Sequence, residues 1–353
     1  MQVKRVVLIY DPNLSKTLTA SEKKIVHDIA KVVKRNNIDN ISRTEAYLRY
    51  YNAHSNIKWS FLAHMVSRNA GWNMGDLQGK WFPLILDKKK RAILFRTYER
   101  ANWLIFHDAY PQLLLYHYST KNGAPMFHLL PYFHVSQFMV KEWNRFWEKG
   151  DRERLLTALI INEQNLIQKP VVEQPRYKKN VFHTLLFDFQ DWFHYSCVLL
   201  PTMNGRLYGS SVHGFRSVDR RVDLGKKLAA TLFNETYYPY FYEFATNTSH
   251  SGSRFDYEQY VHPKPKRTTP YLRVTFPIID HHIQEYEDWS ETNRIKRKWF
   301  APIKKHSHAT ELSTWYKKKQ TRLHRAIILR HHLKSKFESL GFNKREKRKF
   351  KKN

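Results

Sequence analysis

The 353-residue sequence contains a single cysteine, Cys197, so no disulfide can form within the chain. Secreted domains commonly depend on disulfides, and the lack of one fits a reducing compartment. No stretch approaches the ~20 apolar residues of a membrane-spanning helix. Acidic residues and proline interrupt the longest apolar runs, 104–118 and 184–200, and the run at 6–10 is too short for a secretory signal. We therefore expect a cytoplasmic protein without a transmembrane segment; peripheral association with a membrane or the nucleoid stays open.

Acidic residues are also scarce. The chain has 31 Asp and Glu against 61 Lys and Arg, which gives a formal net charge of +30. A field of this sign attracts polyanions such as nucleic acid or anionic lipid headgroups, and it bears on partners rather than on fold. The segment 292–353 alone contains 21 Lys or Arg and three acids, so 18 of the 30 net charges lie there.

Apolar residues make up 42% of the chain and aromatic residues 15%, which is enough for a sizeable core. Helical periodicity and capping residues predict a compact array of helices between about 17 and 168. Ser42 and Glu45 have the spacing of a capping box, so they predict the start of the second helix. The expected helices are about 19–35, 42–54, 58–69, 89–108, 136–150 and 151–168.

Glycine and proline predict where helices stop in this first half. Gly71, Gly75 and Gly79 are expected to lie in a loop after the third helix. Pro111 is expected to end or kink the fourth helix, because proline cannot donate the backbone hydrogen bond that a helix interior needs.

The second half is less regular. A helix is expected at 219–233 and a loop at 247–252. Apolar and polar residues alternate over 271–278, which is typical of a strand, but Pro277 restricts it to a sheet edge or an extended arm. We expect a mainly α protein: a helical body at 1–289 and a basic tail at 290–353 that is partly helical and disordered at its end.

Four polar residues cluster where the third helix meets the expected loop. His64 and Arg68 share one helical face, and Asn69 and Asp76 follow. Polar groups at a helix–loop junction are a common place for a binding site. The alternative, which we favour, is a structural ion pair between Arg68 and Asp76.

Glu163 continues an apolar helical face, so its carboxylate should point inward. A buried carboxylate needs a cationic partner or its pKa rises, and Arg43, Arg68 or a histidine is the expected partner. Such a group can act as a general acid or base, although a structural ion pair is favoured. Together with His64, Arg68, Asn69 and Asp76, it defines the candidate pocket of an enzyme of unknown reaction.

No motif for a metal, a nucleotide or another cofactor is present. His281, His282 and Glu285 have a spacing that fits one helical turn, but no second ligand pair accompanies them. Cys197 lies in an apolar run without an identifiable activating base, so we interpret it as a small buried apolar residue. We expect neither a metal site nor a cofactor.

The basic tail contains a helical stripe and is the candidate binding surface. Its cations can neutralise phosphates while Trp315 and Tyr316 stack on bases. Alternatively, the tail lies on an anionic membrane, or it only aids solubility. The candidate binding residues are Trp315, Lys317, Lys318, Lys319, Arg322, Arg325 and Arg330.

The segment 40–79 contains NISRTEAYLRYY and WSFLAHMVSRNAGWNMGDLQG. It resembles the domain-of-unknown-function 2515 family of spore-forming and related Firmicutes, over roughly residues 20–290. The resemblance implies a bacterial cytoplasmic protein and no established activity, so it assigns no catalytic residue. Polyanion binding through the basic tail is the leading hypothesis and the enzyme is the alternative; the sequence predicts no oligomeric state.

Overall fold

The computed structural model describes residues 18–174, 197–211, 214–283, 285–302 and 311–339. The expected disorder of the last ten residues lies outside this range. The elements are, in chain order, α1 (Ala20–Asn36), α2 (Asn40–Ala53), α3 (Trp59–Asp76), η2 (Phe82–Leu84), α4 (Lys88–Asn122), η3 (Phe127–Phe133), α5 (Gln137–Lys149), α6 (Arg152–Leu166), η4 (Gln168–Val172), β1 (Cys197–Pro201), β2 (Leu207–Ser211), α9 (Val218–Leu232), α10 (Tyr238–Asn247), α11 (Phe255–Glu258), α12 (Leu272–Thr275), α13 (Trp289–Thr292), η6 (Arg297–Phe300) and α14 (Ser313–Ser339).

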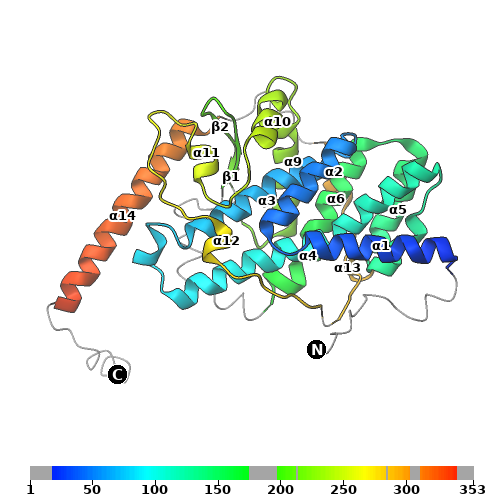
Figure 1. Cartoon of the computed structure of the whole chain (residues 1–353), viewed down its shortest axis with the longest axis horizontal. Helices are drawn as coiled ribbons and strands as arrows, with labels where there is room; N and C mark the ends of the chain where they lie inside the picture. Colours follow the sequence, from blue (N-terminus) through cyan, green and yellow to red (C-terminus); the bar gives the residue numbers. More distant parts are fainter. Residues whose placement is uncertain (1–17, 175–196, 212–213, 284, 303–310, 340–353) are drawn as a thin grey trace.

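The mainly α fold is confirmed. Helices α1 to α6 pack side by side, and α14 lies at the opposite end of the molecule from α5 (Figure 1). The central helix α3 is buried along most of its length, from Trp59 to Asp76. One apolar core joins α1–α6, the β1–β2 hairpin, α9 and α10.

The helix starts expected near 19, 136 and 151 and the helix end expected at 150 are confirmed. Thr19 and Glu22 form a capping box at α1, with Glu22 N donating to Thr19 Oγ1 at 3.3 Å. Ser136 and Asp151 cap α5 and α6, and Gly150 ends α5 in a left-handed conformation with φ of 66°. These caps satisfy the free amide and carbonyl groups of the helix ends, as the sequence predicts.

The predicted start of the second helix is wrong. Asp39, not Ser42, is the N-cap of α2: its Oδ1 accepts from Ser42 N at 2.8 Å. An Asp caps as well as a Ser. Arg273 further fixes Asp39, with Nε 2.7 Å from Oδ2.

The loop expected at the glycines is also wrong, because α3 continues through Gly71 and Gly75 to Asp76. A Cβ at position 71 would lie 2.3 Å from Asn40 Oδ1, and one at position 75 would lie 2.2 Å from the Gly252 carbonyl oxygen. These glycines therefore allow close packing within a helix rather than ending it.

Helix α4 does not end at Pro111. It runs for 35 residues, about 50 Å, with a buried Pro111 inside it. Packing on the core holds both halves of the helix, which outweighs the missing backbone hydrogen bond.

Of the two alternatives for 271–278, the edge strand is wrong. Leu272–Thr275 forms the short helix α12, and Phe276 stacks on Phe95 with ring centroids 3.9 Å apart. Within the described residues the sheet has two strands, β1 and β2, paired antiparallel from Cys197↔Ser211 to Pro201↔Leu207. The alternation of apolar and polar residues over 271–278 therefore does not reflect a paired strand.

The basic segment after 290 packs on the body over part of its length. Trp299 is a member of the same buried core as α1–α6, and Trp315 and Tyr316 pack against it. Leu323 and Ile327 of α14 are buried as well. The body and the first half of α14 thus share packing across the expected boundary at 289.

The first prediction concerns Gly75. Alanine in a helix interior normally stabilises relative to glycine by up to about 1 kcal/mol. Gly75→Ala should instead destabilise by about 2 kcal/mol or more, because its Cβ would collide with the backbone at Gly252. Urea unfolding measures the difference.

Gly123→Ala is the control, since no atom lies within 4 Å of a Cβ there and its φ is 67°. This variant should be destabilised only by the strain of an alanine in the left-handed conformation, about 1 kcal/mol. If Gly75→Ala stabilised the protein, the close approach of α3 to the Gly252 carbonyl would be contradicted.

Candidate functional site

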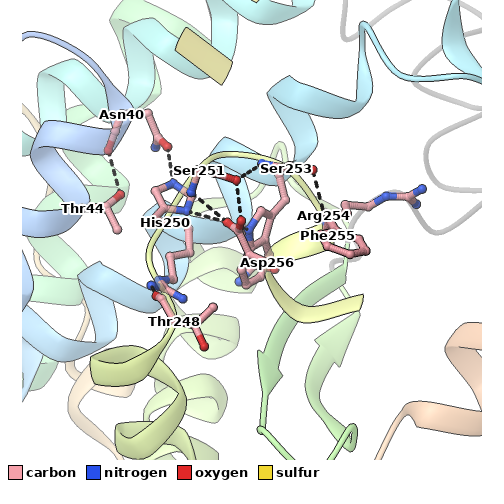
Figure 2. Close-up of polar contacts among 12 residues, drawn as sticks. Asn40, Thr44, Thr248, His250, Ser251, Ser253, Arg254, Phe255 and Asp256 are labelled. Atoms are coloured by element: carbon pink, nitrogen blue, oxygen red, sulfur yellow. Dashed lines mark hydrogen bonds and ion pairs between the residues drawn. The ribbon is translucent and has the colours of Figure 1, made fainter. Parts of the chain in front are cut away.

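The segment 248–256, which connects α10 to α11, carries a dense set of polar side chains against α2 and α3 (Figure 2). Its letters are TSHSGSRFD. His250 and Asp256 point toward each other in Figure 2, whereas the Arg254 side chain points away from both. All three side chains are buried.

Asp256 is held by three donors. Trp72 Nε1 donates to its Oδ2 at 2.9 Å, Ser251 N donates to the same oxygen at 3.0 Å, and the Ser251 hydroxyl donates to Oδ1. Burial raises the pKa of this carboxyl, but His250, Ser251 and Trp72 together leave its pKa below the usual value. Asp256 is therefore ionised in the interior.

His250 extends the contacts to α2. Its Nε2 lies 2.8 Å from Asn40 Oδ1 and its Nδ1 lies 3.4 Å from Asp256 Oδ2. Asn40 Nδ2 donates to Ser67 Oγ at 3.1 Å, and Ser67 Oγ lies 2.6 Å from Thr44 Oγ1. We call Asn40, Thr44, Ser67, His250 and Asp256 the buried polar network.

A buried guanidinium lies beside this network. Arg68 is 2% exposed, and its Nη2 donates to the Thr248 carbonyl oxygen. Its guanidinium carbon lies 5.1 Å from the centre of the Phe244 ring. Its Nε and Nη1 have no hydrogen-bond partner among the described residues. Burial lowers the pKa of Arg68 to about 10, while the negative charge of Asp256 raises it.

His64 lies near Arg68 and is uncharged at neutral pH. Burial lowers its pKa well below the usual value, and the Arg68 charge lowers it further. Its Nδ1 lies 2.8 Å from the Thr44 carbonyl oxygen, and its Nε2 has no partner among the described residues.

A carboxylate beside an imidazole resembles two of the three members of a nucleophilic catalytic triad, but the geometry does not complete one. The neighbouring hydroxyl, Ser251 Oγ, bonds to Asp256 rather than to His250. His250 Nε2 faces Asn40, and the residue is 6% exposed, so a substrate has no access to it. The buried polar network instead fixes the 248–256 segment to α2 and α3.

A small cavity of about 30 Å³ lies on another face of α3, beneath α14. Asn69, Trp72 and Asp76 form one wall, Arg254 and Tyr257 another, and α14 covers it. This volume suits one or two waters. Arg254 Nε lies 2.9 Å from Asp76 Oδ1, and its Nη1 donates to Gln320 Oε1 of α14 at 3.0 Å.

Asn69 lines the cavity and also binds the β1–β2 hairpin. Its Nδ2 donates to the Leu199 carbonyl oxygen at 2.8 Å, and its Oδ1 accepts from Leu199 N at 2.7 Å. The side-chain amide thus pairs with β1 as a neighbouring strand would, which positions the hairpin on α3.

The five residues expected in one pocket are therefore divided. Asn69 and Asp76 line the cavity, whereas His64 and Arg68 belong to the buried region around the network. The favoured ion pair between Arg68 and Asp76 is wrong, since Asp76 pairs with Arg254 and Arg68 bonds to Thr248.

Glu163 forms no hydrogen bond or ion pair with the other four. It accepts from Trp59 Nε1 at 3.2 Å and from Gln164 Nε2 at 2.9 Å. Trp59 and Asp76 lie at opposite ends of α3, which spans about 25 Å. The expected partners Arg43, Arg68 and histidine are wrong; Arg43 pairs with Glu99. The favoured ion pair does not form, and burial raises the pKa of Glu163 to about 7, which is the alternative that the sequence left open.

Sequence reasoning missed a second buried carboxyl, Asp108 on α4. Its Oδ2 accepts from Asn162 Nδ2 at 2.6 Å and from Gln112 Nε2 at 2.7 Å. Burial raises its pKa to about 7. A perturbed pKa marks functional candidates as well as structural ones. Here the two amide donors lower the pKa of Asp108, but burial outweighs them.

Among the residues that the structure describes, no group of three or more His, Cys, Asp and Glu is placed to hold a metal ion. Cys197 is buried in β1, and burial raises the pKa of its thiol to about 12, as an inert apolar residue requires.

Some of the predicted binding residues of α14 face solvent, whereas Trp315 and Lys319 are half-buried. Lys317, Lys318, Arg322 and Arg325 are exposed. Lys319 Nζ lies 5.6 Å from the centre of the Trp315 ring. The Arg330 side chain lies outside the described residues.

The next prediction is a double-mutant cycle. Asp256→Asn should destabilise by about 3–5 kcal/mol, because it removes the carboxylate that balances buried Arg68. Adding Arg68→Met should restore part of the loss, with a coupling free energy of about 1 kcal/mol or more. Urea unfolding of the four proteins measures it.

The exposed pair Glu45 and Arg49, with atoms 3.8 Å apart, is the matched control. Its coupling should stay below about 0.5 kcal/mol. If the losses at 68 and 256 simply add, the two charges do not support each other.

Asp108 gives a prediction of pH dependence. Its pKa of about 7 exceeds the value of 3.8 expected for the unfolded chain. Its stabilising contribution is therefore complete below about pH 4 and is lost as the pH rises through 7. Asp108→Asn should thus gain stability relative to wild type by about 2–4 kcal/mol between pH 4 and pH 8.

Unfolding midpoints of both proteins across this range test the prediction. Histidines with lowered pKa values affect both proteins equally, so the difference isolates Asp108. A difference that does not change with pH would contradict the raised pKa.

Comparison with known proteins identifies relatives but no activity. A family model described as "Protein of unknown function (DUF2515)" matches residues 35–332. An uncharacterised protein of Bacillus subtilis strain 168, YppC, is 47% identical over 313 residues, which cover 88% of this chain and 97% of YppC. No solved structure matches. The chain therefore belongs to the DUF2515 family.

Proposed function

We propose that the protein binds a polyanion, nucleic acid or an anionic membrane, through exposed cations at the α14 end, and that it does so in the cytoplasm. Three basic segments support this. They contribute Lys80 and Lys88–Lys90 before and at the start of α4, Lys264, Lys266 and Arg267 before α12, and Lys317, Lys318, Arg322 and Arg325 on α14, all exposed. We call these residues the basic surface.

Contacts bring the three segments together. Lys80 N donates to the Thr268 carbonyl oxygen at 2.9 Å. The Trp81 ring stacks on His324 of α14 with centroids 4.0 Å apart. Segments far apart in sequence therefore lie at one end of the molecule, with α14 (Figure 1).

Neighbouring acids neutralise little of this charge. Asp76 and Asp256 are buried and already engaged by Arg254 and by the network. Exposed Asp87 caps α4 and forms an ion pair with one member of the surface, Lys90, at 3.7 Å. Clustered cations without matching acids raise the local concentration of phosphate-bearing ligands. The convergence of the three segments is the observation that carries the proposal.

The structure supplies no described helix of the length and apolar character that a membrane crossing demands. Any membrane contact in this proposal is therefore peripheral.

The test replaces charges rather than deleting the basic segment, because Trp299, Leu323 and Ile327 are buried and a truncation would expose core. Changing Lys317, Lys318, Arg322 and Arg325 to Gln should weaken binding to duplex DNA or to phosphatidylglycerol vesicles about 100-fold at low salt. For DNA, the slope of log affinity against log salt should fall by about 3–4.

The control changes Lys23, Lys24, Lys31 and Lys34, which are exposed on α1, to Gln. The net charge falls equally, but α1 lies away from α14 (Figure 1). Equal weakening by the two variants would mean that binding depends on net charge and not on the basic surface.

A further inference from the structure

Two exposed apolar side chains extend the cationic stripe of α14. Ile328 is 41% exposed and Leu329 is 62% exposed. Lys318, Arg322, Arg325 and Leu329 follow one another at intervals of four, three and four residues, which places them on one helical face. The stripe thus ends in an apolar pair.

The inner face of the helix is separate and already packed. Leu323 and Ile327 are 4% and 2% exposed, and Tyr316 bonds to Tyr257 with the two hydroxyl oxygens 2.8 Å apart. These contacts fix the rotation of α14, so Ile328 and Leu329 are directed outward. Figure 1 shows this end of α14 projecting from the body.

Base stacking receives little support from the same helix. Tyr316 is engaged by Tyr257, and Gln320 Nε2 also donates to its hydroxyl at 2.8 Å. Trp315 packs against the core, with Lys319 over its ring. Aromatic rings that bind single strands need free faces, and both aromatics expected for that role are occupied.

We propose that the polyanion is an anionic lipid surface, with α14 as the docking element. This rests on the proposed function and names the partner of the same surface. Arg322 and Arg325 bind lipid phosphates, while Ile328 and Leu329 insert among the acyl chains near the headgroups. Charge complementarity selects the anionic surface, and the apolar pair favours lipid over nucleic acid, which offers it no apolar phase.

The sequence next to the apolar pair adds charge of the same sign. Residues 331–353 contain nine Lys or Arg and two acids. Each cation near an anionic membrane strengthens binding about fivefold. Electrostatic attraction therefore brings the helix to the surface, and insertion of the apolar pair slows its release.

The experiment uses the full chain and three probes: vesicles containing 30% phosphatidylglycerol, neutral phosphatidylcholine vesicles, and duplex DNA at equal phosphate concentration. Sedimentation measures binding to vesicles and fluorescence anisotropy measures binding to DNA. Wild type should bind the anionic vesicles at least tenfold more tightly than either other probe.

Two charge-neutral variants isolate the apolar pair. Ile328→Ser with Leu329→Ser should weaken binding to anionic vesicles at least tenfold and leave DNA binding unchanged. Val274→Ser on α12 is the control, because Val274 is 80% exposed and lies outside α14. It should bind vesicles as wild type does. Circular dichroism confirms that both variants are folded.

The outcomes separate the two proposals. Binding to DNA without preference for anionic vesicles overturns the lipid assignment and keeps polyanion binding. Vesicle binding that the double Ser variant does not weaken also overturns it. Failure to bind any probe at low salt ends the proposed function itself.

Discussion

At Gly75 the backbone of α3 comes so near the Gly252 carbonyl that a Cβ there would lie 2.2 Å from the oxygen. The 248–256 segment can reach α3 this closely because Gly75 lacks a side chain. That approach brings Asp256 to Trp72 and places the negative charge beside buried Arg68. Arg68 is thus buried with the help of Gly75, which lies about two turns away along the same helix. The 248–256 segment, which contacts both residues, connects them.

Helix α3 also explains why the polar cluster does not form one pocket. Residues on a helix project in all directions, and α3 is covered on nearly every side. His64 and Arg68 face the network, whereas Asn69 and Asp76 face β1, Arg254 and α14. Each of these four side chains has at least one hydrogen-bond or ion-pair partner outside α3. This arrangement favours a scaffold role for the cluster over a shared catalytic one.

Sequence patterns predicted what local chemistry determines and missed what depends on distant partners. The caps at Thr19, Ser136 and Asp151 were predictable because each acts within one turn. Gly71 and Gly75 were misread because their reason lies near position 250, and Pro111 because packing overrides its local effect. The rise in the Glu163 pKa followed from burial alone, but its partner Trp59 depends on how α6 meets α3. His250 and Asp256 had only the polar, glycine-containing loop at 247–252 as a local signal.

The cations on the outer face of α14 repel one another and destabilise the helix when no partner is bound. Lys318 and Arg322 are four residues apart and Arg322 and Arg325 three apart, and like charges at these spacings destabilise a helix by about 0.2–0.5 kcal/mol per pair. A helix with only a structural role would place acids between them, yet residues 313–339 contain one acid, Glu338. Leu323 and Ile327 already anchor the inner face without these charges. A bound layer of phosphates would relieve this repulsion, which is the physical reason for proposing an anionic partner for α14.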